Sequence, residues 1–249
     1  MDDLLDATYA AEQAHFWYHG FRRFVRPLLE QAIAGLPRPR LLDCGCGTGT
    51  NLRMLAEYGE AFGFDLTWRG LKFAQQHGIR RIAQASVTHV PYASDHFDVV
   101  TSFDILYCLA EPAEEAAIAE MNRLLRPGGA VIVNVAALDM LRGDHSVLGG
   151  EVRRYTPLRL RAALEHGGFE ILRLTYTNAT IFPLVAGIRL WQRVRGVDER
   201  TKTGDFFLPP VPINAALKGV LAVEAAALRW TNMPIGSSLL CLARKRKER

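Results

Sequence analysis

Apolar residues along this chain cluster in short runs, which are separated by segments with a helical spacing of apolar positions. Seven runs predict buried strands, at residues 40–44, 61–64, 80–84, 97–103, 130–138, 169–177 and 237–244. The helical spacing predicts helices near 49–58, near 66–77 and at 111–125. Because strands and helices alternate, the pattern predicts an α/β fold with a doubly wound sheet of parallel strands.

Three further segments do not fit this alternation. Residues 11–34 have the pattern of an amphipathic helix, and a Pro-rich linker at 35–40 separates them from the first strand. Residues 139–157 and 178–236 are inserted after strands, whose carboxyl ends form the ligand-binding crevice in sheets of this kind. We therefore expect both insertions to overhang the crevice as a lid and a substrate pocket. The alternative is that they only cover an edge of the sheet.

The sequence LLDCGCGTGTNL (41–52) predicts a strand that breaks into a tight glycine turn before a helix. Glycine lets the backbone approach a ligand closely because it has no Cβ atom. The dinucleotide fingerprint G-x-G-x-x-G/A fails here, since Thr50 occupies its last position. Asp65 ends the next strand, about 20 residues after Gly45, where a carboxylate accepts hydrogen bonds from a ribose. The pattern indicates a nucleoside ligand without a diphosphate, and it disfavours a dinucleotide-dependent oxidoreductase.

Composition narrows the class of protein further. Of the 249 residues 49% are hydrophobic, yet no uncharged apolar run reaches the roughly 18 residues that a membrane span needs. The N-terminus is acidic, so we expect no signal peptide. Four cysteines are few for this length and suit a reducing cytoplasm. Cys44 and Cys46 lie inside the glycine turn with no second ligand pair at zinc spacing, so no metal site is predicted.

The net charge of +4 resides in the C-terminal run RKRKER (244–249), which holds five basic residues and one acidic residue. A solvated C-terminus explains this run, and a contact with nucleic acid or an anionic membrane is the alternative. The rest of the chain has no basic stripe with interleaved aromatic residues. Nucleic acid is therefore not expected as a substrate.

Four motifs in a fixed order give the chain a family resemblance. They are LLDCGCGTG (41–49), GFDLT (63–67), VPYASDHFDVV (90–100) and NRLLRPGGAVIV (122–133). In this order the chain resembles class I S-adenosylmethionine-dependent methyltransferases, and among them the group that acts on small molecules. The resemblance covers residues 38–177 and the last strand. It implies a seven-stranded Rossmann-like core (38–177 and 237–244), an N-terminal helical lid (1–37) and an inserted substrate cap (139–157 and 178–236).

The resemblance also implies which residues hold S-adenosylmethionine. The residues that would face its methionine part are Asp43, Gly45, Cys46 and Gly47. Asp65 would bind the ribose, and the residues that would lie along the adenine are Leu66, Ser86 and Val87. Ser86 stands where the family commonly has an acidic residue. Phe103 and Asp104, after the fourth predicted strand, would lie near the ammonium group of the cofactor.

The stretch HFWYHGFRRF (15–24) is dense in aromatic and basic residues. Many members of the group have a similar W-(F/Y)-x-G-x-R stretch. One interpretation is a structural helix that covers the sheet. The other is a lid in which Tyr18 shields the sulfonium and Arg22 binds the carboxylate of the cofactor.

Methyl transfer from a sulfonium depends on positioning and on excluding water, and an oxygen or nitrogen acceptor also needs a base. His145, in the first insertion, is the candidate base, with Tyr155 and Asp104 as further catalytic candidates. A loop histidine that is simply exposed is the alternative. Glu151 stands where the subgroup often has a histidine. The neighbouring Arg153 and Arg154 would either bind an anionic acceptor or pair with Glu151.

The second insertion combines apolar helical faces with a few basic charges, which favours an apolar acceptor. The sequence thus predicts an enzyme that transfers a methyl group from S-adenosylmethionine to a small, apolar molecule, with oxygen the favoured acceptor atom. A second hypothesis is a membrane-associated methyltransferase of lipids, quinones or glycan precursors, in which 178–236 and the basic tail touch the membrane. A third is a non-catalytic cofactor-binding partner protein. We expect a cytoplasmic protein, and the oligomeric state stays open.

Overall fold

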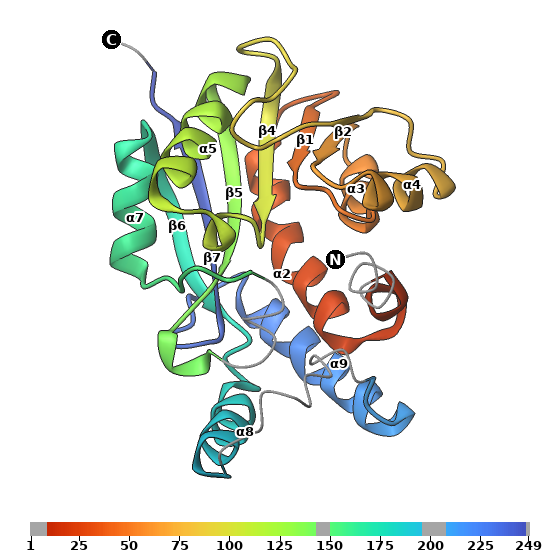
Figure 1. Cartoon of the computed structure of the whole chain (residues 1–249), viewed down its shortest axis with the longest axis vertical. Coiled ribbons are helices and arrows are strands. Elements are labelled where there is room, and N and C mark those ends of the chain that lie inside the picture. The colour runs from red at the N-terminus through yellow and green to blue at the C-terminus, as the bar shows by residue number, and fades with distance from the viewer. Residues whose placement is uncertain (1–8, 143–149, 196–207, 248–249) are drawn as a thin grey trace.

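The computed structural model describes residues 9–142, 150–195 and 208–247 (Figure 1). Its centre is a seven-stranded sheet in the order β3-β2-β1-β4-β5-β7-β6. The strands are β1 (Arg40–Cys44), β2 (Glu60–Asp65), β3 (Ile82–Gln84), β4 (Phe97–Phe103), β5 (Leu125–Ala136), β6 (Phe169–Thr177) and β7 (Ser238–Lys245). The predicted seven-stranded, doubly wound α/β sheet is confirmed. The expectation of parallel strands is wrong for β7, which runs antiparallel to both β5 and β6.

Helices cover both faces of the sheet, so the central strands are apolar on both sides. In β1, Leu41 and Leu42 point to opposite faces, and both are fully buried. The helices on the face of Leu42 are α5 (Glu111–Leu124) and α7 (Pro157–His166). Those on the face of Leu41 are α2 (Phe16–Ala32), α3 (Thr50–Ala56), α4 (Trp68–Gln76) and α9 (Val211–Ala227).

The single N-terminal helix predicted at 11–34 is in fact interrupted at His15. Residues 9–14 form a short helical segment, and α2 begins at Phe16. His15 is in an extended conformation, and its imidazole accepts a hydrogen bond from the backbone N–H of Trp17 (3.2 Å). It therefore caps α2 and lets the preceding segment take a different direction.

The described helices of the two insertions lie at the end of the sheet where the parallel strands have their carboxyl ends (Figure 1). The first contains the short helix η2 (Asp139–Leu141), and the second contains α8 (Phe182–Arg195) and α9. Helix α8 lies beside η2, and α9 packs along α2. A further short helix, η1 (Leu106–Cys108), follows β4 at the same end.

Two buried polar side chains join α9 to its neighbours. The side-chain amide of Asn214 accepts a hydrogen bond from the N–H of Phe16 (2.8 Å) and donates one to the carbonyl of Ala14 (2.9 Å). The carboxylate of Glu224 accepts hydrogen bonds from the N–H groups of Ala179 and Thr180 (2.9 Å each), just before α8. Helix α9 is thus fixed both to the N-terminal helices and to the start of α8.

The substitution Asn214→Ala should lower the free energy of unfolding by about 1–3 kcal/mol, because it leaves buried backbone groups of Phe16 and Ala14 unpaired. Denaturant unfolding of the whole chain measures this change. Ala215→Ser, at an exposed position of the same helix, is the matched control and should have almost no effect. Equal stability of the two variants would contradict a structural role for the Asn214 bonds.

Candidate active site

The turn after β1 depends on three glycines with left-handed backbone conformations. Gly45, Gly47 and Gly49 have φ angles of 74°, 51° and 80°. Residues with a Cβ atom rarely adopt this region, which explains the G-x-G-x-G spacing without a dinucleotide. The turn is held against the end of β2, because the N–H groups of Gly45 and Cys46 both donate to the carbonyl of Phe64 (2.9 Å each).

Asp65, the last residue of β2, completes this attachment. Its Oδ2 accepts the N–H of Gly47 (2.8 Å), and its Oδ1 accepts the N–H (2.8 Å) and the hydroxyl (2.5 Å) of Thr67. A carboxylate offers about four acceptor positions, so about one stays available on Oδ2 for a ligand. Asp65 therefore orders the glycine turn, and its predicted contact with a ribose would be an additional role.

Asp43, at the carboxyl end of β1, is a buried carboxylate with an unused oxygen. Its Oδ1 accepts the hydroxyl of Thr101 (2.7 Å), whereas its buried Oδ2 has no hydrogen-bond partner among the described residues. Burial raises the pKa of Asp43 to about 7; the Thr101 bond opposes this rise, and the carboxylates of Asp65 and Glu12 add to it. A buried oxygen without a partner costs free energy unless a ligand supplies a donor. Asp43 therefore fits a ligand with a positively charged donor.

Glu12 is a residue of this site that the sequence analysis missed. Its carboxylate accepts hydrogen bonds from the hydroxyls of Thr48 and Thr50 at the end of the glycine turn, the latter at 2.7 Å. Burial raises its pKa, against hydrogen bonds from the two threonines and the nearby charge of Arg22. A glutamate in an amphipathic segment gives no signal of its own in the sequence, because most such residues are solvated.

Arg22, on α2, lies beside Glu12, which agrees with the interpretation of α2 as a lid. Its Nη2 donates to the backbone carbonyl of Glu12 (3.2 Å), and its buried Nη1 has no hydrogen-bond partner among the described residues. On the same helix, the ring of Phe21 packs edge-on against Phe103, with 5.0 Å between centroids. Tyr18 is half-buried and lies edge-on to His15 at 6.3 Å. The structure thus brings Arg22 and the buried Phe103 to the site, and shielding by Tyr18 stays a prediction.

The residues predicted for the adenine lie next to the end of β2. Leu66 follows that strand directly and is 69% exposed, whereas Val87 is buried. Ser86 is half-buried, and its hydroxyl lies 2.9 Å from that of Thr88. The backbone of Ala85 donates to the carbonyl of Asp65 (3.0 Å), which keeps this loop beside the site. Contacts of the three residues with an adenine stay a prediction.

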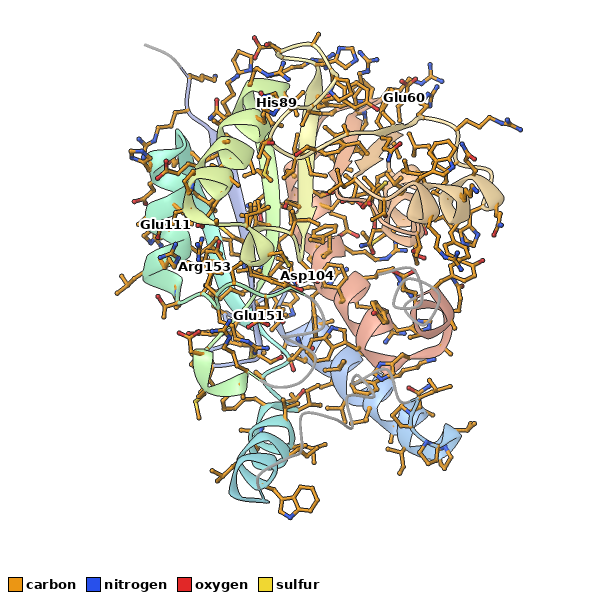
Figure 2. All side chains as sticks on the ribbon, in the orientation of Figure 1. Glu60, His89, Asp104, Glu111, Glu151 and Arg153 are labelled. Carbon is orange, nitrogen blue, oxygen red and sulfur yellow. The ribbon has the colours of Figure 1, made fainter. Side chains whose placement is uncertain are left out.

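Asp104 lies directly after β4, at the carboxyl end of the sheet (Figure 2). It has a left-handed φ of 62°, and its Oδ1 accepts a hydrogen bond from the amide of Asn134 (2.9 Å). Such conformations in residues other than glycine are frequent at functional sites. Desolvation raises the pKa of Asp104 to about 7, and the hydrogen bond from Asn134 opposes this rise. A carboxyl group with this pKa is partly ionised at neutral pH, and its carboxylate form is then suited to accept a proton.

Tyr155 is fully buried, and its hydroxyl donates to the carboxylate of Glu114 on α5 (2.5 Å). Glu114 also pairs with Arg153 and, at 3.2 Å, with Arg159. This cluster anchors the first insertion to α5. A catalytic role for Tyr155 stays a prediction. The burial of Tyr155 and its bond to Glu114 do not support that role.

The two arginines predicted in the first insertion both form ion pairs, but with different glutamates. Arg154 forms a two-point pair with Glu151 (2.8 and 3.1 Å), as one of the two interpretations expected, whereas Arg153 pairs with Glu114. His145 lies outside the described residues. Figure 2 places His89 at the opposite end of the sheet from Asp104, so it does not belong to this site.

Comparisons with known proteins show which family the chain resembles. Residues 42–133 match the family model described as a methyltransferase domain. The chain is 30% identical over 156 residues to a ubiquinone biosynthesis O-methyltransferase of Aromatoleum aromaticum, covering 57% of this chain and 66% of that protein. It is 34% identical over 117 residues to a demethylmenaquinone methyltransferase of Renibacterium salmoninarum, covering 46% and 48%. The chain thus spans between about half and two thirds of the length of these relatives.

The solved structures agree on the fold. An S-adenosylmethionine-dependent methyltransferase from Thermotoga maritima superposes with a TM-score of 0.61 at 15% identity, covering 99% of this chain and 100% of that one. The chain belongs to the class I S-adenosylmethionine-dependent methyltransferase superfamily. Membership of this superfamily implies S-adenosylmethionine as the cofactor.

If Asp65 binds the cofactor ribose, Asp65→Ala should weaken S-adenosylmethionine binding by about 1–3 kcal/mol. Titration calorimetry measures this loss. Asp65→Asn is the informative control, because it retains one acceptor oxygen for Gly47 or for the ribose and should bind with intermediate affinity. Unchanged affinity in the alanine variant would contradict the assignment of Asp65 to the site.

A cationic ligand stabilises the ionised form of Asp43, so binding should release a proton when Asp43 is protonated beforehand. We therefore expect the affinity for S-adenosylmethionine to rise with pH up to about 7, the pKa of Asp43 in the free protein, and to level off above it. Calorimetry in buffers of different ionisation enthalpy counts the released protons. The Asp43→Asn protein should lose most of this dependence, and an identical pH profile in both proteins would rule Asp43 out as its source.

Proposed function

We propose that the protein binds S-adenosylmethionine at the glycine turn and transfers its methyl group to a small, apolar acceptor, with oxygen as the accepting atom. One observation carries the cofactor assignment. The turn has beside it a buried carboxylate oxygen (Asp43 Oδ2) and a buried guanidinium nitrogen (Arg22 Nη1), neither paired among the described residues. A methionine group carries an ammonium and a carboxylate, so it complements both charges.

When bound, this cofactor supplies an electrophilic methyl group on a sulfonium. The contribution of the chain is then positioning and the exclusion of water. Helix α2 would cover the site with Phe21 and Tyr18, and Asp65 would keep the glycine turn in place. Asp104 would take the proton of an acceptor hydroxyl, since its pKa near 7 lets it act at neutral pH.

The nature of the insertions supports an apolar acceptor. The exposed side chains of η2 and α8 include Met140, Leu184 and Ile188, which are apolar. The relatives from Aromatoleum aromaticum and Renibacterium salmoninarum are named for ubiquinone biosynthesis and for demethylmenaquinone, and quinones of this kind are apolar molecules. A membrane-associated acceptor such as a quinone precursor is therefore the second candidate. The name of the first relative, an O-methyltransferase, supports oxygen as the acceptor atom.

Label transfer tests this function. The full-length protein is incubated with methyl-labelled S-adenosylmethionine and a host-cell extract, which is then separated into organic, aqueous and macromolecular fractions. Label in the organic fraction supports an apolar acceptor and provides material for its identification. Label only in the other fractions contradicts the apolar acceptor. Cofactor binding without any transfer, repeated with synthetic demethylated quinones, would favour a non-catalytic cofactor-binding protein.

The substitution Asp104→Asn should lower kcat by about 10²-fold with an oxygen acceptor, because it removes the base. The rate of the unaltered protein should rise as pH increases through about 7 and then level off, since only the ionised carboxylate accepts a proton. The variant should lack this rise. A variant with weakened cofactor binding but normal kcat would instead assign Asp104 to the cofactor ammonium.

A further inference from the structure

Helix α9 is apolar on its exposed side as well as on its buried side. Its exposed positions are Val211, Pro212, Ile213, Ala215, Ala216, Gly219, Val220, Val223 and Ala226. Its polar residues do not lie on the exposed side. Asn214 and Glu224 are buried and hydrogen-bonded, and Lys218 is half-buried. A surface helix of a globular protein normally has polar residues toward solvent. An apolar exposed side indicates that another surface covers α9.

Helix α8 has the same property. Its exposed positions with described side chains are Pro183, Leu184, Gly187, Ile188, Leu190 and Trp191. Most of them line a shallow apolar hollow of about 400 Å³. Together with Trp230, which follows α9 and is 88% exposed, these positions of α8 and α9 form what we call the cap face.

The charges of the two helices select among the surfaces that could cover the cap face. Helix α8 contains Arg189, Arg193 and Arg195 and no acidic residue. The only acidic residue of α9, Glu224, is 1% exposed and is hydrogen-bonded to backbone N–H groups. The sequences of the two helices therefore contribute more basic than accessible acidic residues. A second copy of the chain would bring like charges together, whereas an anionic lipid surface is complementary.

We propose that the cap face docks on the surface of an anionic lipid membrane. The contact is peripheral, since none of the helices in the described ranges combines the length and the apolar character needed to cross a bilayer. Trp230 suits this setting, because the ring of a tryptophan is apolar and its N–H finds a partner in the headgroup region. The proposal rests on the cap face alone and does not require methyl transfer.

The position of the cap face has a consequence for the site. Both helices lie at the carboxyl end of the sheet (Figure 1). Asp43 is the next-to-last residue of β1 and Asp104 directly follows β4, so both belong to this end. Docking there would bring the crevice close to the bilayer, from which an apolar acceptor could enter. Strand β7 ends at the opposite end of the molecule from α8 and α9 (Figure 1), so the contact proposed here does not use the described part of the basic tail, residues 244–247.

Sedimentation with vesicles tests the proposal. The full-length protein is mixed with vesicles of phosphatidylcholine alone and of phosphatidylcholine with phosphatidylglycerol, and the bound fraction is measured against lipid concentration. The partition coefficient should be higher for the anionic vesicles and should fall with added salt. Ile188→Glu and Val223→Glu should each lower it by about tenfold or more, because each replaces a side chain that enters the interface.

Leu158→Glu is the matched control. Leu158 is 80% exposed on α7, outside the cap face, so this variant should bind vesicles like the unaltered protein. S-adenosylmethionine affinity and circular dichroism establish that all three variants are folded. The proposal is overturned if no vesicle binds, or if the cap-face variants bind like the control. It is also overturned if light scattering detects a dimer that these variants dissociate while vesicle binding stays absent, since a second copy would then cover the face.

Discussion

The hydrogen bond from the Gly47 N–H to the Asp65 carboxylate (2.8 Å) fixes the glycine turn to the end of β2. Together with the bonds from the Gly45 and Cys46 N–H groups to the carbonyl of Phe64, it holds the left-handed conformations of Gly45 and Gly47, which matters because glycine loses more conformational freedom on folding than other residues. The same glycine turn positions the hydroxyls of Thr48 and Thr50, which donate hydrogen bonds to the carboxylate of Glu12. Through Glu12 and Arg22, the N-terminal helices are joined to the same turn. One carboxylate at a strand end therefore organises most of the proposed cofactor site.

The carboxylates and the unpaired guanidinium nitrogen gathered in this region are best explained by a bound ligand. Glu12, Asp43 and Asp65 lie close enough to influence one another, and burial raises the pKa of the first two. Gathering carboxylates in a partly buried place costs free energy in the free protein. A cation placed among these carboxylates offsets this free-energy cost. The unpaired nitrogen of Arg22 can donate a hydrogen bond to the anionic end of the same ligand. The charge pattern thus favours a zwitterionic ligand over a simple anion such as a phosphate.

The sequence predicted those parts of the fold that depend on local patterns. The strand predicted at 97–103 is β4, and the helix predicted at 111–125 is α5 within one residue, because a buried apolar run and acidic residues in a first helical turn are local signals. The direction of β7 was not predictable in this way, since it depends on pairing with β5 and β6 across long insertions. The break at His15 was missed because a capping side chain overrides an otherwise continuous amphipathic pattern.

The same distinction applies to the site. Asp43, Asp65 and the glycines could be predicted as site residues because motif spacing marks them directly. Glu12 was missed, and Tyr155 was given a role its surroundings do not support, because their partners are distant in the chain. Glu12 reaches Thr50 across 38 positions, and Tyr155 reaches Glu114 across 41. Such pairings arise only when the N-terminal segment and the first insertion fold back onto the sheet.

The most direct test of the central claim is titration calorimetry of the full-length protein with S-adenosylhomocysteine, with NADH as the competing nucleotide. The demethylated cofactor retains the ammonium, carboxylate and ribose that Asp43, Arg22 and Asp65 are proposed to bind, but it cannot react. We predict saturable binding at a single site for S-adenosylhomocysteine and none for NADH under the same conditions. Binding of NADH in preference to S-adenosylhomocysteine would contradict the proposed use of the glycine turn.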